Sequence, residues 1–125
     1  MILGIGIDIV EISRIERILN EYGEIFTHRI FTAGEIAYCE RKKCPAIYYA
    51  ARFAAKEAFL KALGTGLSGG IRWRDIEIVN NTNGKPAIVC HGIASECAKK
   101  MGAEKIDISI SHSREYAVAT AIVSR

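Results

Sequence analysis

The stretch FAAKEAFLK, residues 53–61, predicts a helix with one face of small side chains near the middle of this chain. With about 100° of rotation per residue, five alanines in and around it form a narrow stripe that a strand or another backbone can approach closely: Ala51, Ala54, Ala55, Ala58 and Ala62. Glu57 and Lys61 lie at the edge of this stripe, four residues apart with the acid first, which is the favourable order for a helical ion pair. The pair therefore indicates either a surface salt bridge or two functional groups.

The composition indicates one globular domain that spans residues 1–125. Half of the residues are apolar and 25% are charged, which argues against disorder, and the net charge of +3 is mild. The four cysteines, at positions 39, 44, 90 and 97, have neither CxxC nor zinc spacing, which indicates structural thiols in a reducing compartment. Because no apolar run reaches membrane-spanning length and the N-terminus has no basic signal region, we expect a soluble, cytoplasmic protein.

The first segment, Ile2 to Val10, alternates isoleucines with Gly4, Gly6 and Asp8, which predicts a strand with one apolar face and one nearly bare face. Glycines beside an acid leave room for a ligand or another backbone to come close to Asp8. The alternative is an edge-strand charge that prevents aggregation. The first interpretation is favoured, because the glycines weaken a strand without helping it to avoid aggregation.

Two capping boxes predict two helices after this strand. Ser13 and Glu16 fit the S-x-x-E pattern at the start of the first helix, and Thr32 and Glu35 begin a shorter one.

Three arginines, Arg14, Arg17 and Arg29, are expected on the outer surface of this region. They indicate either a basic patch for an acidic partner or an ordinary solvated face.

The rest of the chain alternates turn signals with short regular elements. Pro45 predicts the start of the long helix and Gly64 its end. Residues 80–86 are expected to form a hairpin loop between two short strands, and residues 92–101 a short helix.

Two strands close the chain, at residues 106–110 and 116–123, with His112 at the polar corner between them. A single histidine at such a corner is more often a local hydrogen-bond partner than a functional group. The order of elements predicts an α+β domain with helices packed on a mainly antiparallel sheet.

Two carboxylates, Asp8 and Glu57, stand out because they lie on different elements, each beside small residues and with lysines nearby. Two carboxylate oxygens, completed by waters and substrate phosphates, describe a Mg²⁺ site. Phosphoryl-type chemistry is the natural use of such a site.

These residues resemble the holo-[acyl-carrier-protein] synthases, the small class of 4′-phosphopantetheinyl transferases. The segments GIGIDIVEISRIE, residues 4–16, and FAAKEAFLKALGTG, residues 53–66, match the two signature blocks of that family in the right order and at the right spacing. Looser matches at residues 83–86 and 110–113 extend the resemblance over nearly the whole chain. The basic run at residues 41–43 and the loop at residues 67–73 match less well.

The resemblance implies that the arm of coenzyme A is transferred to a serine of apo acyl carrier protein, which releases adenosine 3′,5′-bisphosphate and supports fatty acid biosynthesis. It implies that Asp8 and Glu57 hold Mg²⁺ against the pyrophosphate and that Lys61 binds phosphate as a point charge. Glu57, directly or through a water, is the expected base for the serine hydroxyl.

The remaining roles implied by the resemblance concern binding. Arg52, Lys56 and His112, with Lys61, are expected to hold the coenzyme. Arg14 is expected to meet the acidic helix of the carrier protein, with Arg17 and Arg29 as weaker candidates.

The glycine-lined strand face around Asp8 and the alanine stripe are more close-packing surface than one small chain covers, which predicts a homo-oligomer. The resemblance implies a trimer in which neighbouring chains share each site, so that Asp8 and His112 reach it from different chains.

Two functions of other classes are weighed against the transferase. Single-strand nucleic-acid binders interleave basic residues with stacking aromatics on a sheet, whereas here the aromatics crowd the helices, so no nucleic-acid partner is expected. In a purely structural oligomer, Asp8 and Glu57 are inert and coenzyme A does not bind in a metal-dependent way.

Overall fold

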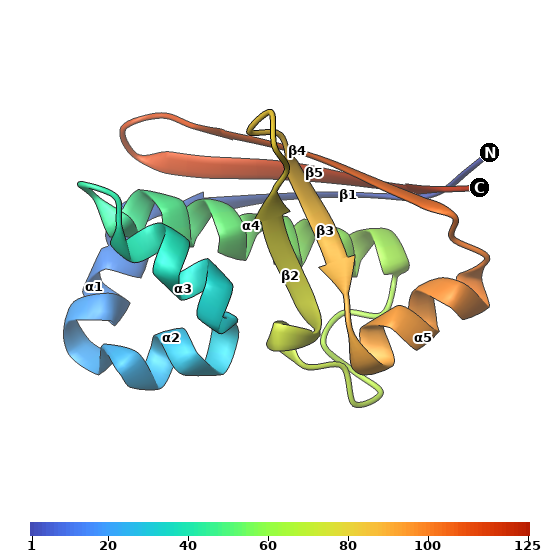
Figure 1. Cartoon of the computed structure of the whole chain (residues 1–125), viewed down its shortest axis with the longest axis horizontal. Helices are drawn as coiled ribbons and strands as arrows, with labels where there is room; N and C mark the ends of the chain where they lie inside the picture. The colour runs from blue at the N-terminus through green and yellow to red at the C-terminus, as the bar shows by residue number, and fades with distance from the viewer.

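A computed structural model describes all 125 residues as an α+β fold with two antiparallel sheets (Figure 1). The three-stranded sheet has the order β1–β5–β4, and β2 pairs with β3 in a separate hairpin. This confirms the predicted class of fold. The elements follow one another as β1 (Ile2–Glu11), α1 (Ile12–Tyr22), α2 (Glu24–Ile30), α3 (Ala33–Glu40), α4 (Pro45–Leu63), the 3-10 helix η1 (Trp73–Asp75), β2 (Ile76–Asn80), β3 (Pro86–Cys90), α5 (Gly92–Met101), β4 (Lys105–His112) and β5 (Tyr116–Ser124).

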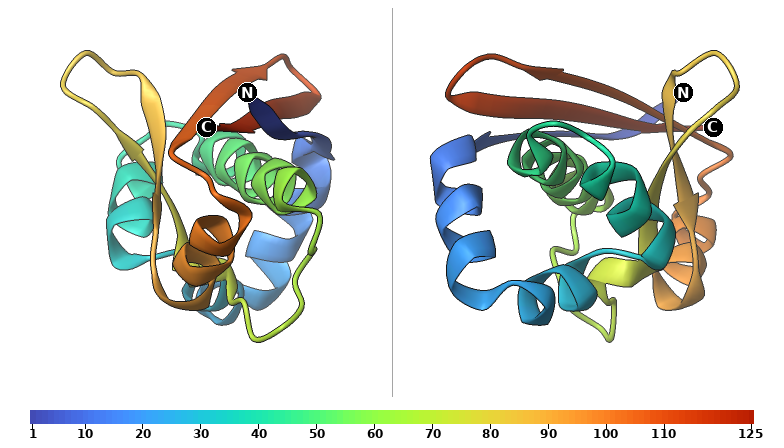
Figure 2. Two further views of the ribbon diagram at one scale, coloured as in Figure 1. Left: turned by 90° about the vertical axis from the view of Figure 1, so that its right-hand side faces the viewer. Right: turned by 60° about the vertical axis from the view of Figure 1, so that its left-hand side comes forward.

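The long helix α4 lies at the centre of the molecule. The three-stranded sheet runs along one side of it, while α1, α3 and the β2–β3 hairpin lie around its other sides (Figures 1 and 2). All five alanines of the predicted stripe are buried. Pro45 occupies the first turn, and Gly64 ends the helix with a φ of 77°, a left-handed conformation that suits glycine. The predicted bounds of this helix are therefore confirmed.

The glycine face of β1 lies directly on α4. A Cβ atom at Gly4 would overlap the carbonyl oxygen of Ala62, and one at Gly6 would overlap that of Ala58. Only glycine allows the strand backbone to come this close. The close approach predicted beside Asp8 is thus made by the backbone of α4.

The isoleucine face of β1 points away from α4 and is uncovered in this chain. Ile5, Ile7 and Ile9 are 62%, 59% and 62% exposed, and they pair directly with Ile122, Thr120 and Val118 of β5. The reason that the sequence suggested for an oligomer is wrong, because the glycine face and the alanine stripe cover each other within one chain. The surface that remains uncovered is instead this apolar face of the sheet.

The predicted start of the first helix is also wrong. β1 continues to Glu11, and α1 begins at Ile12 with no loop between them, so Ser13 lies inside the helix and makes no capping hydrogen bond. The backbone N–H of Ile12 donates instead to the carbonyl of Glu115 at 2.8 Å. The carbonyl of Glu115, in the turn between β4 and β5, therefore satisfies one of the free N–H groups at the start of α1, a capping role that was expected of Ser13.

The helix α2 was missed by the sequence analysis. Gly23, with a φ of 53°, separates it from α1. The second capping box is confirmed at α3, where Glu35 N donates to Thr32 Oγ1 at 3.3 Å and Thr32 N donates to Glu35 Oε1 at 2.9 Å.

The other expected elements are confirmed: the hairpin around residues 80–86, helix α5, and the two closing strands. All four cysteines are free. Burial raises the pKa of Cys39 to about 12 and that of Cys90 to about 11, so both remain protonated thiols. None of the helices combines the length and the hydrophobicity that a membrane span requires.

Candidate functional site

Helix α4 brings two of its charged residues to Asp8 on β1. The Nζ atom of Lys61 lies 3.2 Å from Asp8 Oδ1 and donates to the carbonyl of Ile7 at 3.0 Å. The carboxylate of Glu57 is in no ion pair. The salt bridge that the i,i+4 spacing allowed is therefore absent, because Lys61 reaches across to the strand instead.

Glu57 is an unbalanced carboxylate. Burial, followed by the charge of Asp8, raises the pKa of Glu57, and Lys61 offsets this only in part. A cation between Asp8 and Glu57 would relieve both the burial and the repulsion. Two carboxylates with the other positions left to water and phosphate are the ligand set that suits Mg²⁺, so these residues fit a divalent ion. No group of three or more His, Cys, Asp or Glu side chains is arranged to hold a metal by itself.

His112 lies apart from this site within one chain. It ends β4, at one edge of the three-stranded sheet, whereas Asp8 lies on β1 at the other edge. Asp8 pairs with Ala119 and His112 with Ala117, both on the central strand β5, so at least two strand spacings, about 9.5 Å, separate their backbones. Asp8, Glu57 and Lys61 are thus gathered by one chain, and His112 is not.

His112, at the end of β4, instead packs against a group of cationic and aromatic side chains on α3, α4 and the loop between them. Its ring packs edge-on against Tyr48, with 6.1 Å between the ring centroids. The Nζ of Lys42 lies 4.6 Å from the ring centre of Tyr38 and 5.2 Å from that of Tyr48. Arg52 lies under Tyr38, with its Cζ atom 3.9 Å from the ring centre. We call Tyr38, Lys42, Tyr48, Arg52 and His112 the basic–aromatic cluster.

Of these five residues, the sequence analysis named only Arg52 and His112, as expected coenzyme contacts. It missed Tyr38, Lys42 and Tyr48. Arg52 is 5% exposed, its Nη2 donates to Asn80 Oδ1 at 2.9 Å, and its Nε has no hydrogen-bond partner. The partner of Arg52 in the cluster is Tyr38 on α3, which no local spacing in the sequence indicated. Lys42 was visible only as part of a basic run.

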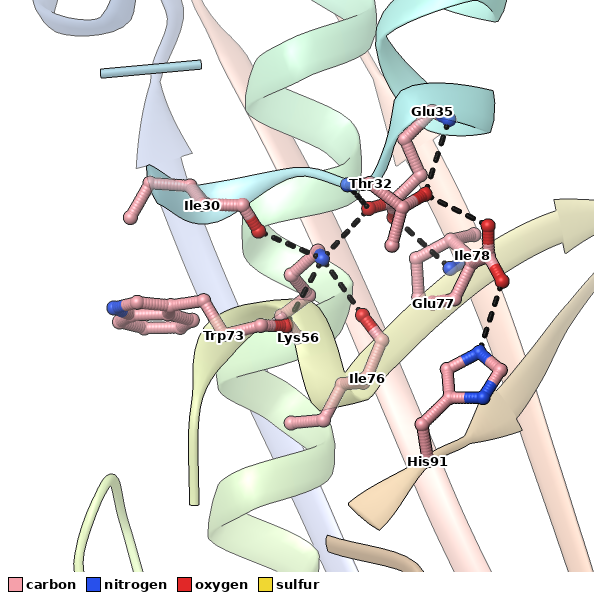
Figure 3. A network of polar contacts seen from close by, with 9 residues as sticks. All are labelled: Ile30, Thr32, Glu35, Lys56, Trp73, Ile76, Glu77, Ile78 and His91. Carbon is pink, nitrogen blue, oxygen red and sulfur yellow. Dashed lines mark hydrogen bonds and ion pairs between the residues drawn. The ribbon is translucent and has the colours of Figure 1, made fainter. Parts of the chain in front are cut away.

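Lys56 does not fit the coenzyme contact that the resemblance implied. Its side chain is completely buried, and its Nζ contacts Glu35 Oε1 at 2.7 Å and the carbonyls of Ile30, Ile76 and Trp73 (Figure 3). Burial lowers the pKa of Lys56, and Glu35 acts against that shift. The ammonium of Lys56 already has four oxygen neighbours and no solvent exposure, so it cannot contact a phosphate of the coenzyme.

Arg14 and Arg17 are exposed on α1, and Arg29 is exposed on α2. None of them is in an ion pair, so their charges face solvent unbalanced. Two apolar side chains at the corner between these helices are exposed as well, Tyr22 at 52% and Ile25 at 76%. The region therefore combines uncompensated positive charge with apolar surface.

A groove of about 880 Å³ lies elsewhere, between α1, α2, α3 and the start of α4. Its lining includes Leu19, His28 and Cys44, but none of the acids or lysines that meet at β1. The size of the groove therefore says nothing about the reaction, and the site at Asp8 is defined by its charges.

With this geometry in place, the comparison with known proteins places the chain in a class. Residues 4–121 match the family model of the 4′-phosphopantetheinyl transferase superfamily, and the chain belongs to that superfamily.

Individual relatives are more specific. The chain is 48% identical over 123 residues to the holo-[acyl-carrier-protein] synthase of Solibacter usitatus, with 98% of each chain covered. It is 48% identical over 125 residues to that of Geotalea daltonii, with all of both chains covered. Among solved structures, the holo-[acyl-carrier-protein] synthase of Neisseria meningitidis superposes with a TM-score of 0.92 at 36% identity over the whole of both chains. The enzyme of Helicobacter pylori in complex with coenzyme A gives a TM-score of 0.85 at 33% identity, with 96% of this chain and 99% of that one covered.

Proposed function

We propose that this chain, as one domain of residues 1–125, acts as a holo-[acyl-carrier-protein] synthase. It transfers the 4′-phosphopantetheine arm of coenzyme A to a serine of apo acyl carrier protein. The products are holo carrier protein and adenosine 3′,5′-bisphosphate, and the reaction serves fatty acid biosynthesis in the cytoplasm. The observation that carries the proposal is the meeting of Asp8, Glu57 and Lys61 on β1 and α4, inside the two segments that match the family signature.

The roles of these residues follow from their chemistry. The serine oxygen attacks the phosphorus that bears the pantetheine, the anhydride P–O bond breaks, and the bisphosphate leaves. Glu57 accepts the hydroxyl proton, directly or through a water. Lys61, with a half-exposed side chain, neutralises the phosphate as a point charge. When Asp8 and Glu57 hold Mg²⁺, the ion supplies Lewis-acid neutralisation of the pyrophosphate.

The basic–aromatic cluster is proposed to bind the nucleotide part of the coenzyme. Lys42 and Arg52 offer positive charge, and the rings of Tyr38 and Tyr48 offer faces on which a base can stack. The unpartnered Nε of Arg52 supports an anion nearby. His112 packs against Tyr48 in the same group, which supports the coenzyme contact that the resemblance implies for it.

The surface of α1 and α2 is proposed to receive the carrier protein. Arg14, Arg17 and Arg29 are exposed without ion-pair partners, which suits an acidic partner. Tyr22 and Ile25 add apolar contact area beside them.

The assembly is proposed to be a homotrimer with each site shared between two chains. Two observations support sharing. The apolar sheet face of Ile5, Ile7 and Ile9 is uncovered, and the basic–aromatic cluster lies at the opposite sheet edge from Asp8. We propose that a neighbouring chain seated on this face completes the site of Asp8 and Glu57 with its own basic–aromatic cluster.

The deciding experiment incubates the chain with coenzyme A, Mg²⁺ and apo acyl carrier protein and follows the carrier by mass spectrometry. We expect one phosphopantetheine arm to be added. A carrier in which the acceptor serine is replaced by alanine, and a reaction with EDTA, serve as controls and should stay unmodified. A carrier protein that gains no mass in the complete reaction would overturn the proposal.

A further inference from the structure

Lys56 and Glu35 form an ion pair with no solvent exposure on the side of α4 that faces away from the three-stranded sheet (Figure 3). Lys56 Nζ lies 2.7 Å from Glu35 Oε1. Three carbonyl oxygens complete its surroundings, those of Ile30 at 2.9 Å, Ile76 at 2.6 Å and Trp73 at 3.1 Å. The carbonyls come from the end of α2, from η1 and from the start of β2, so with Glu35 of α3 a single side chain of α4 is bound by four other segments.

Glu35 is held as firmly as its partner. Its Oε1 accepts from the backbone N–H of Thr32 and its Oε2 from that of Ile78, each at 2.9 Å. The side chain of Thr32 continues the network to Glu77 at 2.7 Å. Both ends of the ion pair are therefore fixed in direction by the backbone of neighbouring elements (Figure 3).

Such a pair is poorly explained by stability alone. Removing both charges from water cancels most of their attraction, and apolar residues of the same volume often stabilise a protein as well. What the pair adds is a fixed orientation of α4, because its hydrogen bonds are satisfied in only one position of the helix.

On the opposite side of α4, the contact with β1 does little to fix the rotation of the helix. There the backbone of β1, at Gly4 and Gly6, lies directly against the backbone of α4 at Ala62 and Ala58, so at these two positions no strand side chain interlocks with the helix. Glu57 directly follows Lys56 and faces Asp8 across this backbone contact. A rotation or shift of α4 that displaces Lys56 displaces Glu57 by a similar distance.

We propose that Lys56 and Glu35 are a positioning pair, which fixes the rotation and height of α4 on β1 so that Glu57 and Lys61 face Asp8, and that neither residue touches the coenzyme. The inference rests on the proposed function, in which Asp8 and Glu57 act together. It gives a role to the one cation of the signature helix that has no access to substrate.

The test uses Glu35→Gln, which keeps the size of the side chain and removes its charge, and the neutral double variant Glu35→Gln/Lys56→Met. Three quantities are compared in the full chain: Mn²⁺ affinity by electron paramagnetic resonance without substrate, kcat and KM for coenzyme A, and the melting temperature by circular dichroism. The matched control is Tyr49→Phe, which removes another side-chain hydrogen bond between α4 and α3, from the buried Tyr49 to Glu40 at 2.7 Å.

If the pair positions the site, both variants, measured below their melting temperatures, lose Mn²⁺ affinity and kcat by about 10-fold or more, as partners that orient metal ligands do. The KM for coenzyme A stays unchanged, and Tyr49→Phe keeps wild-type Mn²⁺ affinity whatever its melting temperature. The double variant buries no unpaired charge, so we expect it to fold even if Glu35→Gln alone unfolds the chain. The same three quantities can then be measured on it.

Two results would overturn the proposal. A folded variant with wild-type Mn²⁺ affinity and kcat would make the pair purely structural, and a raised KM for coenzyme A alone would make Lys56 a substrate contact. Transfer by the wild-type chain tests the proposed function separately, since the Mn²⁺ measurement needs no turnover.

Discussion

At the scale of single residues, the site depends on two acids with different surroundings. Asp8 has a cation, Lys61, at 3.2 Å, whereas Glu57 has none and its pKa is raised by burial and by Asp8. Placing Glu57 beside Asp8 therefore costs the folded chain stability, a cost that is understandable if the pair holds a cation during the reaction.

We expect Asp8→Asn and Glu57→Gln each to lower kcat by about 100-fold or more, because each removes an anionic oxygen but keeps the shape. Glu57→Gln should also raise the melting temperature at neutral pH. A raised pKa means that folding disfavours the charged form, and glutamine carries no charge to bury. Transfer kinetics and circular dichroism check both effects. Normal turnover in either variant would contradict the assignment, and unfolding of both would indicate structural roles.

We expect Arg14→Ala to raise the KM for the carrier protein by about fivefold, the equivalent of about 1 kcal/mol, and to leave the KM for coenzyme A unchanged. Raised salt should act on the wild type in the same direction, because the contact is between exposed charges. Lys99→Ala, which removes one exposed charge from α5, is the matched control and should change neither constant. Equal effects on both substrates would mean that Arg14 does not contact the carrier protein.

At the scale of elements, the contact of β1 with α4 and the ties between α3, β2 and α5 hold the site in shape. The first is a contact of backbones, made possible by Gly4 and Gly6. The second passes through Glu77, which accepts from Thr32 Oγ1 at 2.7 Å and lies 3.0 Å from His91 Nε2 (Figure 3).

We expect Gly6→Ala to lower the free energy of unfolding by about 3 kcal/mol, since the new methyl group meets the carbonyl of Ala58 and the strand has to move. Glu96→Ala, at an exposed position of α5, is the control and should change it by less than about 0.5 kcal/mol. Urea denaturation measures both. Equal stability of the two variants would show that β1 does not lie as close to α4 as described.

The hydrogen bond from Thr32, followed by that with His91, lowers the pKa of Glu77 below its ordinary value near 4.5. The stabilisation is therefore fully present above pH 4.5 and is lost as the pH falls toward the lowered pKa. We expect Glu77→Gln to melt below the wild type at pH 6 and to approach it in acid. Glu96→Gln, at an exposed position of α5, should run parallel to the wild type at every pH. Parallel curves for Glu77→Gln would contradict the role of its charge.

At the scale of the whole molecule, the uncovered sheet face is the feature that a single chain leaves unexplained. Ile5, Ile7 and Ile9, each about 60% exposed and flanked on β5 by Val118 and Ile122, form an apolar strip on one face of the sheet. A monomer that exposed such a strip would tend to associate. We expect a closed, symmetric assembly to cover it, because closed symmetry avoids open-ended growth.

We expect sedimentation to report about three times the chain mass of 13.7 kDa for the wild type. Ile7→Glu should dissociate the assembly and abolish transfer, because it places a charge in the interface, while circular dichroism stays unchanged. The control is Val89→Glu, which charges an apolar side chain of β3 that is 40% exposed, and it should remain assembled. A monomeric and fully active wild type would contradict both the trimer and the shared site.

Local signals in the sequence determined most of the elements. The stripe of alanines, the capping box at Thr32, the stop at Gly64 and the closing strands depend on neighbours within a turn or on simple alternation, so their spacing is enough to predict them. The Ser13 box failed because its helix continues directly from a strand and is capped by the distant Glu115. Asp8 and Glu57 were found because an acid among glycines or alanines is rare enough to notice.

Only the tertiary structure decided which partners these residues have. Lys56 and Lys61 are the same residue type on one helix, yet one is enclosed by carbonyls from α2, η1 and β2, and the other reaches the carboxylate of Asp8. The alternation of β1 predicted two faces but could not say that the glycines turn inward and the isoleucines outward. Periodicity determines which side chains share a face, whereas the face that is buried depends on what segments remote in sequence bring against it.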